Sequence, residues 1–247
     1  MEETFRPWTV ISASPDTHNT RHLVLSPPPG LFMRVGLGRH VSFRTTVEGL
    51  EVSRSYTPVV GLGKEWKEKE SLEFLIKVYP DGVMTPGLGL LTAGDTVSVS
   101  SPQGDFLLSS VPHSQDCKLY LLAAGTGITP MIGLLSAIRN LSTKPAVKLI
   151  TFDRTEKDMI WRAEVQQFQA ENSWLSLVRV LSQPGADWTG ERGRVRPELV
   201  MKEVSLVEGL VSRWAAVCGP PGFNRETVRI LREHLAFVQE EIHVFEG

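Results

Sequence analysis

The chain has 247 residues, of which 41% are hydrophobic and 22% are charged, and its formal net charge is -2. This length favours two compact domains, and the composition is globular. The charge balance offers no basic surface for a phosphate backbone, so we expect no nucleic-acid partner. Cys117 and Cys218 are the two cysteines and lack metal-ligand spacing, so we expect no disulfide framework, no metal and a reducing, cytoplasmic location. No apolar run reaches the roughly 18 residues of a membrane-spanning helix.

The first half of the chain is typical of short strands separated by turns. Alternating and β-branched residues predict the clearest strands at residues 23–25, 40–44, 73–79 and 96–100. Proline and glycine clusters at 27–30, 36–38 and 81–82 separate them. Because short antiparallel strands would otherwise leave exposed edges, we expect them to close into a barrel.

The second half alternates apolar runs with amphipathic stretches. Strands are predicted at 118–124, 147–152, 175–181, 214–218 and 241–245, and helices at 130–140, 159–170, near Pro197 and at 223–234. This alternation predicts a parallel sheet covered by helices, because parallel strands need crossover connections. The change of pattern lies between Ser109 and Asp116, so we expect domains at 1–112 and 113–247.

A glycine turn follows the first apolar run of this half. Gly125-Thr126-Gly127 leads into a predicted helix with Thr129 as N-cap and Pro130 at its first position. Glycines permit close backbone approach, and free amides at a helix start can hold a pyrophosphate. Pro130 occupies the place of the third glycine of the dinucleotide fingerprint, so a simple strand-to-helix turn is an equal alternative.

A second turn, Cys218-Gly219-Pro220-Pro221-Gly222, also joins a strand to a helix. The carboxyl ends of parallel strands meet at one edge, so the two turns are expected to share one ligand crevice. Cys218 has no neighbouring base, which favours a small buried hydrophobe over a nucleophile.

A third group of residues lies in the β-rich half. Arg54 can pair with a phosphate, Tyr56 can lie flat against a conjugated ring, and Thr85-Pro86 repeats the predicted cap-and-proline start. Taken singly, these are also an exposed arginine, a core tyrosine and a loop proline. Together these residues could bind a second ligand that contains an aromatic ring and phosphate.

In this order, the motifs resemble the NADH-cytochrome b5 reductase family of the ferredoxin reductase superfamily, over residues 6–245. They are Arg-x-Tyr-Thr-Pro (54–58), Ile-Lys-Val-Tyr (76–79), Gly-x-Met-Thr (82–85), Gly-Thr-Gly-Ile-Thr-Pro (125–130) and Cys-Gly-Pro-Pro (218–221). The resemblance implies a six-stranded antiparallel FAD-binding β-barrel followed by a Rossmann-like parallel-sheet NAD(P)-binding domain. It implies hydride transfer from NADH or NADPH to FAD, then single-electron transfer to a haem acceptor such as cytochrome b5.

The resemblance also assigns site residues. Catalytic positions fall on Thr57, His40 and Cys218, and His40 reads equally well as a half-buried strand histidine. FAD-contacting positions are Arg54, Ser55, Tyr56, Thr57, Leu75, Lys77, Tyr79, Gly82, Val83, Met84, Thr85 and Thr129. NAD(P)H-contacting positions are Gly125, Thr126, Gly127, Thr129, Pro130, Arg154, Ser182, Cys218, Gly219 and Pro220. We further expect a monomer whose partner is a cytochrome b5-type haem domain, separate or covalently fused, with association at the endoplasmic reticulum as an added expectation.

One departure concerns the choice of nucleotide. Relatives that prefer NADH carry an acidic residue after the third Rossmann strand, where this chain has Val180-Leu181-Ser182-Gln183. Arg154, Lys157 and Arg192 fall in loops that could reach the same place, and arginine accommodates a 2′-phosphate. We therefore expect NADPH to be used about as efficiently as NADH, although a solvated run of loop charges explains these residues equally well.

Two other readings remain open. A reductase that feeds an iron-sulfur protein of an oxygenase would share the same chemistry, but two cysteines cannot supply the four ligands of a cluster. A non-catalytic docking module would have no need for Arg54, Tyr56, Thr57 or the glycine turns.

Overall fold

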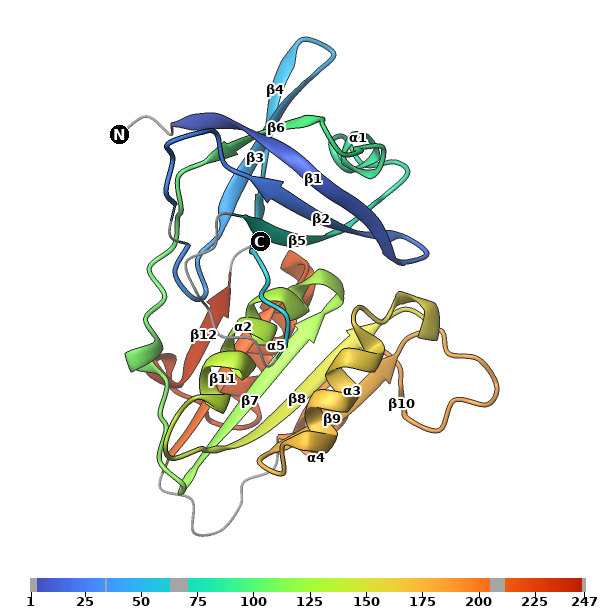
Figure 1. Cartoon of the computed structure of the whole chain (residues 1–247). Helices are drawn as coiled ribbons and strands as arrows, with labels where there is room; N and C mark the ends of the chain where they lie inside the picture. Colours follow the sequence, from blue (N-terminus) through green and yellow to red (C-terminus); the bar gives the residue numbers. More distant parts are fainter. Residues whose placement is uncertain (1–3, 34, 63–70, 205–211, 246–247) are drawn as a thin grey trace.

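The computed structural model describes residues 4–33, 35–62, 71–204 and 212–245. Within these residues the chain folds into two halves, each built on one six-stranded sheet (Figure 1). The antiparallel and parallel sheets confirm the predicted fold class.

The N-terminal half is an antiparallel sheet with the strand order β4-β3-β6-β1-β2-β5. Its strands are β1 (Phe5–Thr17), β2 (Thr20–Ser26), β3 (Val41–Val47), β4 (Leu50–Tyr56), β5 (Leu72–Lys77) and β6 (Thr96–Ser100). A bridge between Val59, three residues after β4, and Glu73 of β5 brings the two edge strands together. The enclosed core contains Trp8, Phe43 and Phe74, each at most 1% exposed.

The C-terminal half is a parallel sheet with the strand order β10-β9-β8-β7-β11-β12. Its strands are β7 (Cys117–Ala124), β8 (Ala146–Asp153), β9 (Leu175–Leu181), β10 (Glu191–Arg192), β11 (Ser212–Cys218) and β12 (Ile242–Phe245). The strand order reverses at β7, where doubly wound folds bind ligands at the carboxyl edge.

Helices cover both faces of the parallel sheet. Buried side chains of α2 (Ile128–Arg139) and α3 (Arg162–Glu171) join one core, whereas those of α4 (Pro197–Glu203) and α5 (Pro221–Glu233) join another. The remaining short elements are α1 (Thr85–Gly89), η1 (Leu108–Ser110), η2 (Gly125–Gly127), η3 (Glu156–Asp158) and η4 (Gln239–Glu241).

Three helix starts differ from the sequence prediction. Gly127, not Thr129, is the N-cap of α2, because residues 125–127 already form a 3₁₀ turn; the Thr129 hydroxyl donates to the Thr126 carbonyl at 3.0 Å. Met84, not Thr85, is the N-cap of α1. Helix α3 begins at Arg162 rather than at residue 159, because Trp161 adopts a left-handed conformation with φ +48°.

The halves are in contact on two sides of the carboxyl edge of the parallel sheet. Phe106, in the segment that links the halves, packs on Phe245 and His243 of β12 with ring centroids 5.0 and 4.8 Å apart. At the other side, Asn19 in the β1–β2 turn donates a hydrogen bond to Asp158 of η3 at 3.2 Å. The halves are therefore held together on two sides.

Candidate functional site

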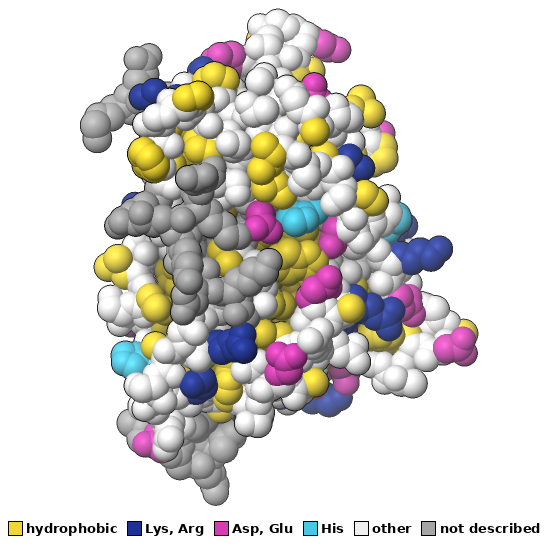
Figure 2. All heavy atoms as spheres, in the orientation of Figure 1, with side chains coloured by type: hydrophobic (Ala, Val, Ile, Leu, Met, Phe, Trp, Pro, Cys, Tyr) yellow, Lys and Arg dark blue, Asp and Glu magenta, His cyan; other side chains and the backbone are white. Residues whose placement is uncertain are grey.

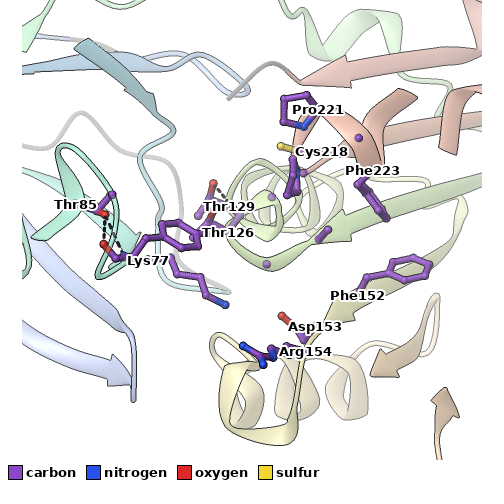
Figure 3. Close-up of a pocket in the computed structure, with 18 of the residues that line it drawn as sticks. Lys77, Thr85, Thr126, Thr129, Phe152, Asp153, Arg154, Cys218, Pro221 and Phe223 are labelled. Carbon is purple, nitrogen blue, oxygen red and sulfur yellow. Dashed lines mark hydrogen bonds between the residues drawn. The ribbon is translucent and has the colours of Figure 1, made fainter. Parts of the chain in front are cut away.

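A cavity of about 1150 Å³ lies between the two sheets. One wall comes from the ends of β4 and β5 and the start of α1, and the other from the carboxyl ends of β7, β8 and β11 (Figure 3). The structure brings into this lining the predicted residues Arg54, Ser55, Tyr56, Thr57, Leu75, Lys77, Tyr79, Gly82, Val83, Met84, Thr85, Gly125, Thr126, Gly127, Thr129, Arg154, Ser182, Cys218, Gly219 and Pro220.

Two predicted site residues lie outside this lining. His40 pairs with Gln103 through its backbone, and its ring Nε2 lies 3.2 Å from Gln103 Oε1. Pro130 is buried in the first turn of α2. The structure thus places both residues outside the cavity lining, and their roles in the site stay predictions.

The cavity also contains residues that the sequence analysis did not assign to either cofactor. They are Pro80, Asp81, Ala124, Phe152, Asp153, Gly193, Arg194, Val195, Pro221, Gly222, Phe223 and Glu226. Phe152 and Asp153 end β8, beside the glycine turn that ends β7. The shared carboxyl edge of parallel strands is the signal that could have predicted them.

Two glycine turns bring bare backbone to the α/β wall. Gly125 has φ +55°, and a Cβ built on it meets open space. A Cβ on Gly127 would lie 2.1 Å from the Cys218 carbonyl oxygen, so this position requires glycine for the two turns to touch. The turns thus form one continuous surface that a ligand backbone or ring can approach closely.

Cys218 is a neutral part of this wall. Its side chain is buried, and burial raises the pKa of the thiol to about 12. A thiol that stays protonated at neutral pH is a poor nucleophile. Cys218 thus lines the cavity as a neutral thiol, and its assignment as a catalytic residue stays a prediction.

On the opposite wall, Tyr56 presents a neutral aromatic ring. The ring packs on Phe43 with centroids 4.6 Å apart, and the hydroxyl lies 3.8 Å from Met84 Sδ. Burial raises the pKa of Tyr56 to about 12, with the charge of Arg54 opposing the shift. Arg54 itself is exposed, and its Nη1 donates to the Ser53 carbonyl at 2.7 Å. This leaves the other guanidinium N–H groups for a phosphate.

The start of α1 is organised by Thr85. Its hydroxyl accepts a hydrogen bond from the Tyr79 N–H at 3.0 Å, and the Gly82 N–H donates to the Tyr79 carbonyl at 2.9 Å (Figure 3). Gly82 is required here, because a Cβ would lie 2.6 Å from Thr85 Oγ1. The Gly82 amide is thus committed to the turn, and any phosphate held by this loop meets the amides that follow it.

Lys77 connects the two walls. Its amine donates to Asp158 Oδ1 at 3.0 Å; the Lys77 side chain is half-buried and the Asp158 side chain is buried. Burial would raise the pKa of Asp158, but hydrogen bonds from Thr155 and Lys77, with the Lys77 charge and Asn19, lower it to about 2. Asp158 is therefore a carboxylate held by groups from both halves of the protein.

The loops near Ser182 show which arginines face the cavity. Arg154 lines it and donates from Nε to Gln183 Oε1 at 2.8 Å. Arg192 does not line it, because its Nη2 donates to carbonyls of its own loop, including that of Trp188 at 2.6 Å. Arg194, which sequence reasoning missed, lines the cavity instead.

The chemistry of the lining suits dinucleotide ligands. The cavity is larger than the upper range of roughly 1,000 Å³ typical of pockets for a single small ligand. It combines arginines for phosphates, an aromatic face for a ring and glycine backbone for close approach. Among the residues that the structure describes, no group of three or more histidine, cysteine, aspartate or glutamate side chains could hold a metal.

Comparison with known proteins supports the same division. Residues 7–107 match the oxidoreductase FAD-binding domain, and residues 121–229 match the oxidoreductase NAD-binding domain. The fold and site thus define an oxidoreductase with an FAD-binding domain and an NAD-binding domain. More narrowly, the chain belongs to the NADH-cytochrome b5 reductase family: it is 31% identical over 92% of its length to NADH-cytochrome b5 reductase 1 of Dictyostelium discoideum, 77% of which it covers.

Other relatives are more similar. Cytochrome b5 reductase 4 of Homo sapiens is 38% identical over 98% of this chain, which covers 47% of that relative. A structure described as the CS-b5R domains of human Ncb5or, in its NAD⁺ form, superimposes with a TM-score of 0.89 and 36% sequence identity. The match covers all of this chain and 70% of the chain in that structure. The chain thus spans about half the length of the first curated relatives it matches.

Proposed function

We propose that this chain is an FAD-dependent NAD(P)H reductase that takes hydride from NADH or NADPH and passes single electrons to a haem acceptor such as cytochrome b5. The observation that carries this proposal is the single cavity whose two walls come from the FAD-binding and NAD-binding halves. Two ligands bound to opposite walls of one cavity can react directly. We also propose 1–112 and 113–247 as the two domains.

The residues of the antiparallel half would hold FAD. Arg54 offers N–H groups to the pyrophosphate, and Tyr56 offers a ring that stays neutral because its pKa is about 12. Thr57 follows Tyr56 in the lining and can donate to a flavin nitrogen. When bound, FAD accepts a hydride from the nicotinamide and gives up its two electrons one at a time.

The residues of the α/β half would hold the nicotinamide nucleotide. The turns at 125–127 and 218–222 offer backbone for close approach, and Thr126 and Thr129 add hydroxyl groups. Cys218 and Phe223 contribute apolar surface that excludes water. These residues position two rings rather than react themselves, which is the protein's role with such cofactors.

The proposed acceptor is a cytochrome b5-type haem domain, either separate or fused within a longer protein. Its support is the family and the length of the relatives, of which this chain covers about half. On the face shown in Figure 2, acidic and basic side chains are interspersed, a pattern unlike the basic stripe of nucleic-acid binding. Among the described residues, no helix has the length and apolarity to cross a membrane. We propose a cytoplasmic monomer that associates with the endoplasmic reticulum.

The test is spectroscopic. The purified chain is expected to show the absorption bands of oxidised flavin, to lose them when NADH is added without oxygen, and to reduce added cytochrome b5. A colourless chain that takes up no FAD on reconstitution would instead support a docking module. Reduction of cytochrome b5 only after an iron-sulfur protein is added would support the oxygenase-type reductase.

A further inference from the structure

Asp153 occupies a central place in the cavity that the proposed function does not use. It is the last residue of β8, paired in register with Leu181 of β9 and adjacent to the strand that ends in Gly125. Figure 3 shows its carboxyl directed into the cavity, with Lys77 extending toward it from the opposite wall. Dinucleotide phosphates bind at this edge of a parallel sheet.

No described residue donates a hydrogen bond to the Asp153 carboxyl. Three charged groups face it, namely Lys77 of β5, Asp158 of η3 and Arg179 of β9. Both cations have other partners: Lys77 donates to Asp158 at 3.0 Å, and Arg179 Nη2 donates to the Arg162 carbonyl at 2.8 Å. Asp153 is thus a carboxyl without a direct partner of its own.

This environment disfavours the ionised form. Burial raises the pKa of Asp153 to about 7; Lys77 and Arg179 oppose the shift, whereas the Asp158 carboxylate adds to it. The carboxyl therefore changes its charge in the neutral range. Most aspartates are fully ionised at neutral pH, unlike Asp153. An anion bound beside Asp153 therefore meets a wall whose charge depends on pH.

Resting on the proposed function, we propose that Asp153 makes binding of the nicotinamide dinucleotide proton-linked: the neutral carboxyl admits the anionic pyrophosphate, and the carboxylate repels it. A bound anion disfavours ionisation of Asp153 further, so binding takes up a proton. The affinity for the dinucleotide is highest below the pKa that Asp153 has in the free protein, and it falls as the pH rises through that pKa.

The experiment measures NAD⁺ binding to the FAD-loaded oxidised protein by calorimetry. NAD⁺ is the probe because its pyrophosphate keeps its charge across the range, whereas the 2′-phosphate of NADP⁺ does not. We expect binding about tenfold weaker near pH 8 than near pH 6, because ten times less protein carries a neutral Asp153. Two buffers with different ionisation enthalpies will reveal the proton taken up.

The variant is Asp153→Asn, which keeps the shape and removes the charge. We expect it to bind NAD⁺ with an affinity independent of pH and without proton uptake, and Asp153→Ser serves if the first variant does not fold. His18→Gln is the matched control, because His18 Nε2 lies 3.9 Å from Asp158 Oδ1 and the substitution removes this contact while leaving Asp153 in place. It is expected to keep the pH dependence.

The inference is wrong if wild-type affinity is the same at both pH values, if Asp153→Asn keeps the slope, or if His18→Gln abolishes it. Failure of the proposed function is distinguishable, since it appears as loss of FAD or of NAD⁺ binding even near pH 6.

Discussion

The wall from the antiparallel sheet presents polar and aromatic side chains to the cavity, whereas the wall from the parallel sheet also contains two glycine turns that present backbone. On the first wall, Arg54, Tyr56 and Lys77 supply charge and ring surface. On the second, Gly125 and Gly127 let the chain approach the ligand and the neighbouring turn. A side chain can be shortened with a graded loss, but a close backbone contact tolerates no added atom. Substitutions should therefore separate the walls by the size and kind of their effects.

The largest effect is expected from Gly127→Ala. Its Cβ would lie 2.1 Å from the Cys218 carbonyl oxygen, so both turns must move. We expect flavin reduction by NADH to slow about a hundredfold, equivalent to about 2.7 kcal/mol, while FAD is retained. Stopped-flow absorbance measures the rate. Gly222→Ala is the control on the same wall, because its Cβ meets open space. Equal rates in the two variants would contradict the role of the close contact.

The wall from the antiparallel sheet is tested with Arg54→Ala. Removing a charged donor to a phosphate is expected to weaken FAD binding by about 1.5–3 kcal/mol, with NADH binding less affected. Quenching of flavin fluorescence on binding measures the affinity. Arg44→Ala, in the neighbouring strand, removes an exposed ion pair with Glu51 and should change little. If both variants bind FAD equally well, Arg54 has no phosphate contact.

The contact that Asp158 makes between the two halves is tested with Asp158→Asn. The folded-state pKa of Asp158 is about 2, below its ordinary 3.8, so its stabilisation is present above pH 3.8 and is lost as pH falls toward 2. We expect the free energy of unfolding to fall by about 2 kcal/mol at neutral pH, and the difference from wild type to shrink in acid. Urea unfolding at several pH values measures it. Asp95→Asn alters similar but exposed hydrogen bonds, which Asp95 accepts from Thr92, and should cost less.

The smallest effect concerns the nucleotide. We expect kcat/KM for NADPH to lie within about a hundredfold of that for NADH, because Arg154 and Arg194 line the same cavity as Ser182. Arg154→Ala should lower kcat/KM for NADPH about tenfold more than for NADH. Steady-state kinetics with NADH and NADPH measure both kcat/KM values. A stronger preference for NADH would show that Arg154 stays with Gln183.

The arrangement of the motifs could be predicted from sequence because it follows from local patterns. Strand-turn-helix units place Gly125 and Cys218 at one sheet edge, and the structure has both in one cavity. The start of α2 could not be predicted as simply. Thr129 has the residue type of an N-cap, but the preceding 3₁₀ turn moves the cap to Gly127.

The electrostatics of the site depend on contacts distant in sequence. Lys77 and Asp158 are 81 positions apart, and Asn19 and Asp158 are 139 positions apart. No local pattern predicts that these groups surround one carboxylate and leave Asp153 without a donor. Arg192 shows the opposite case. Its position in the sequence suggested that it faces the cavity, but its guanidinium donates to a carbonyl of its own loop.

The β1–β2 turn limits how far the two halves can separate. Asn19 and Lys77 both bond to Asp158, and Phe106 packs against Phe245 at the far side of the parallel sheet. Widening the cleft on the first side requires both bonds to Asp158 to break together. The width of the cavity is therefore restrained on both sides by contacts that the fold already contains.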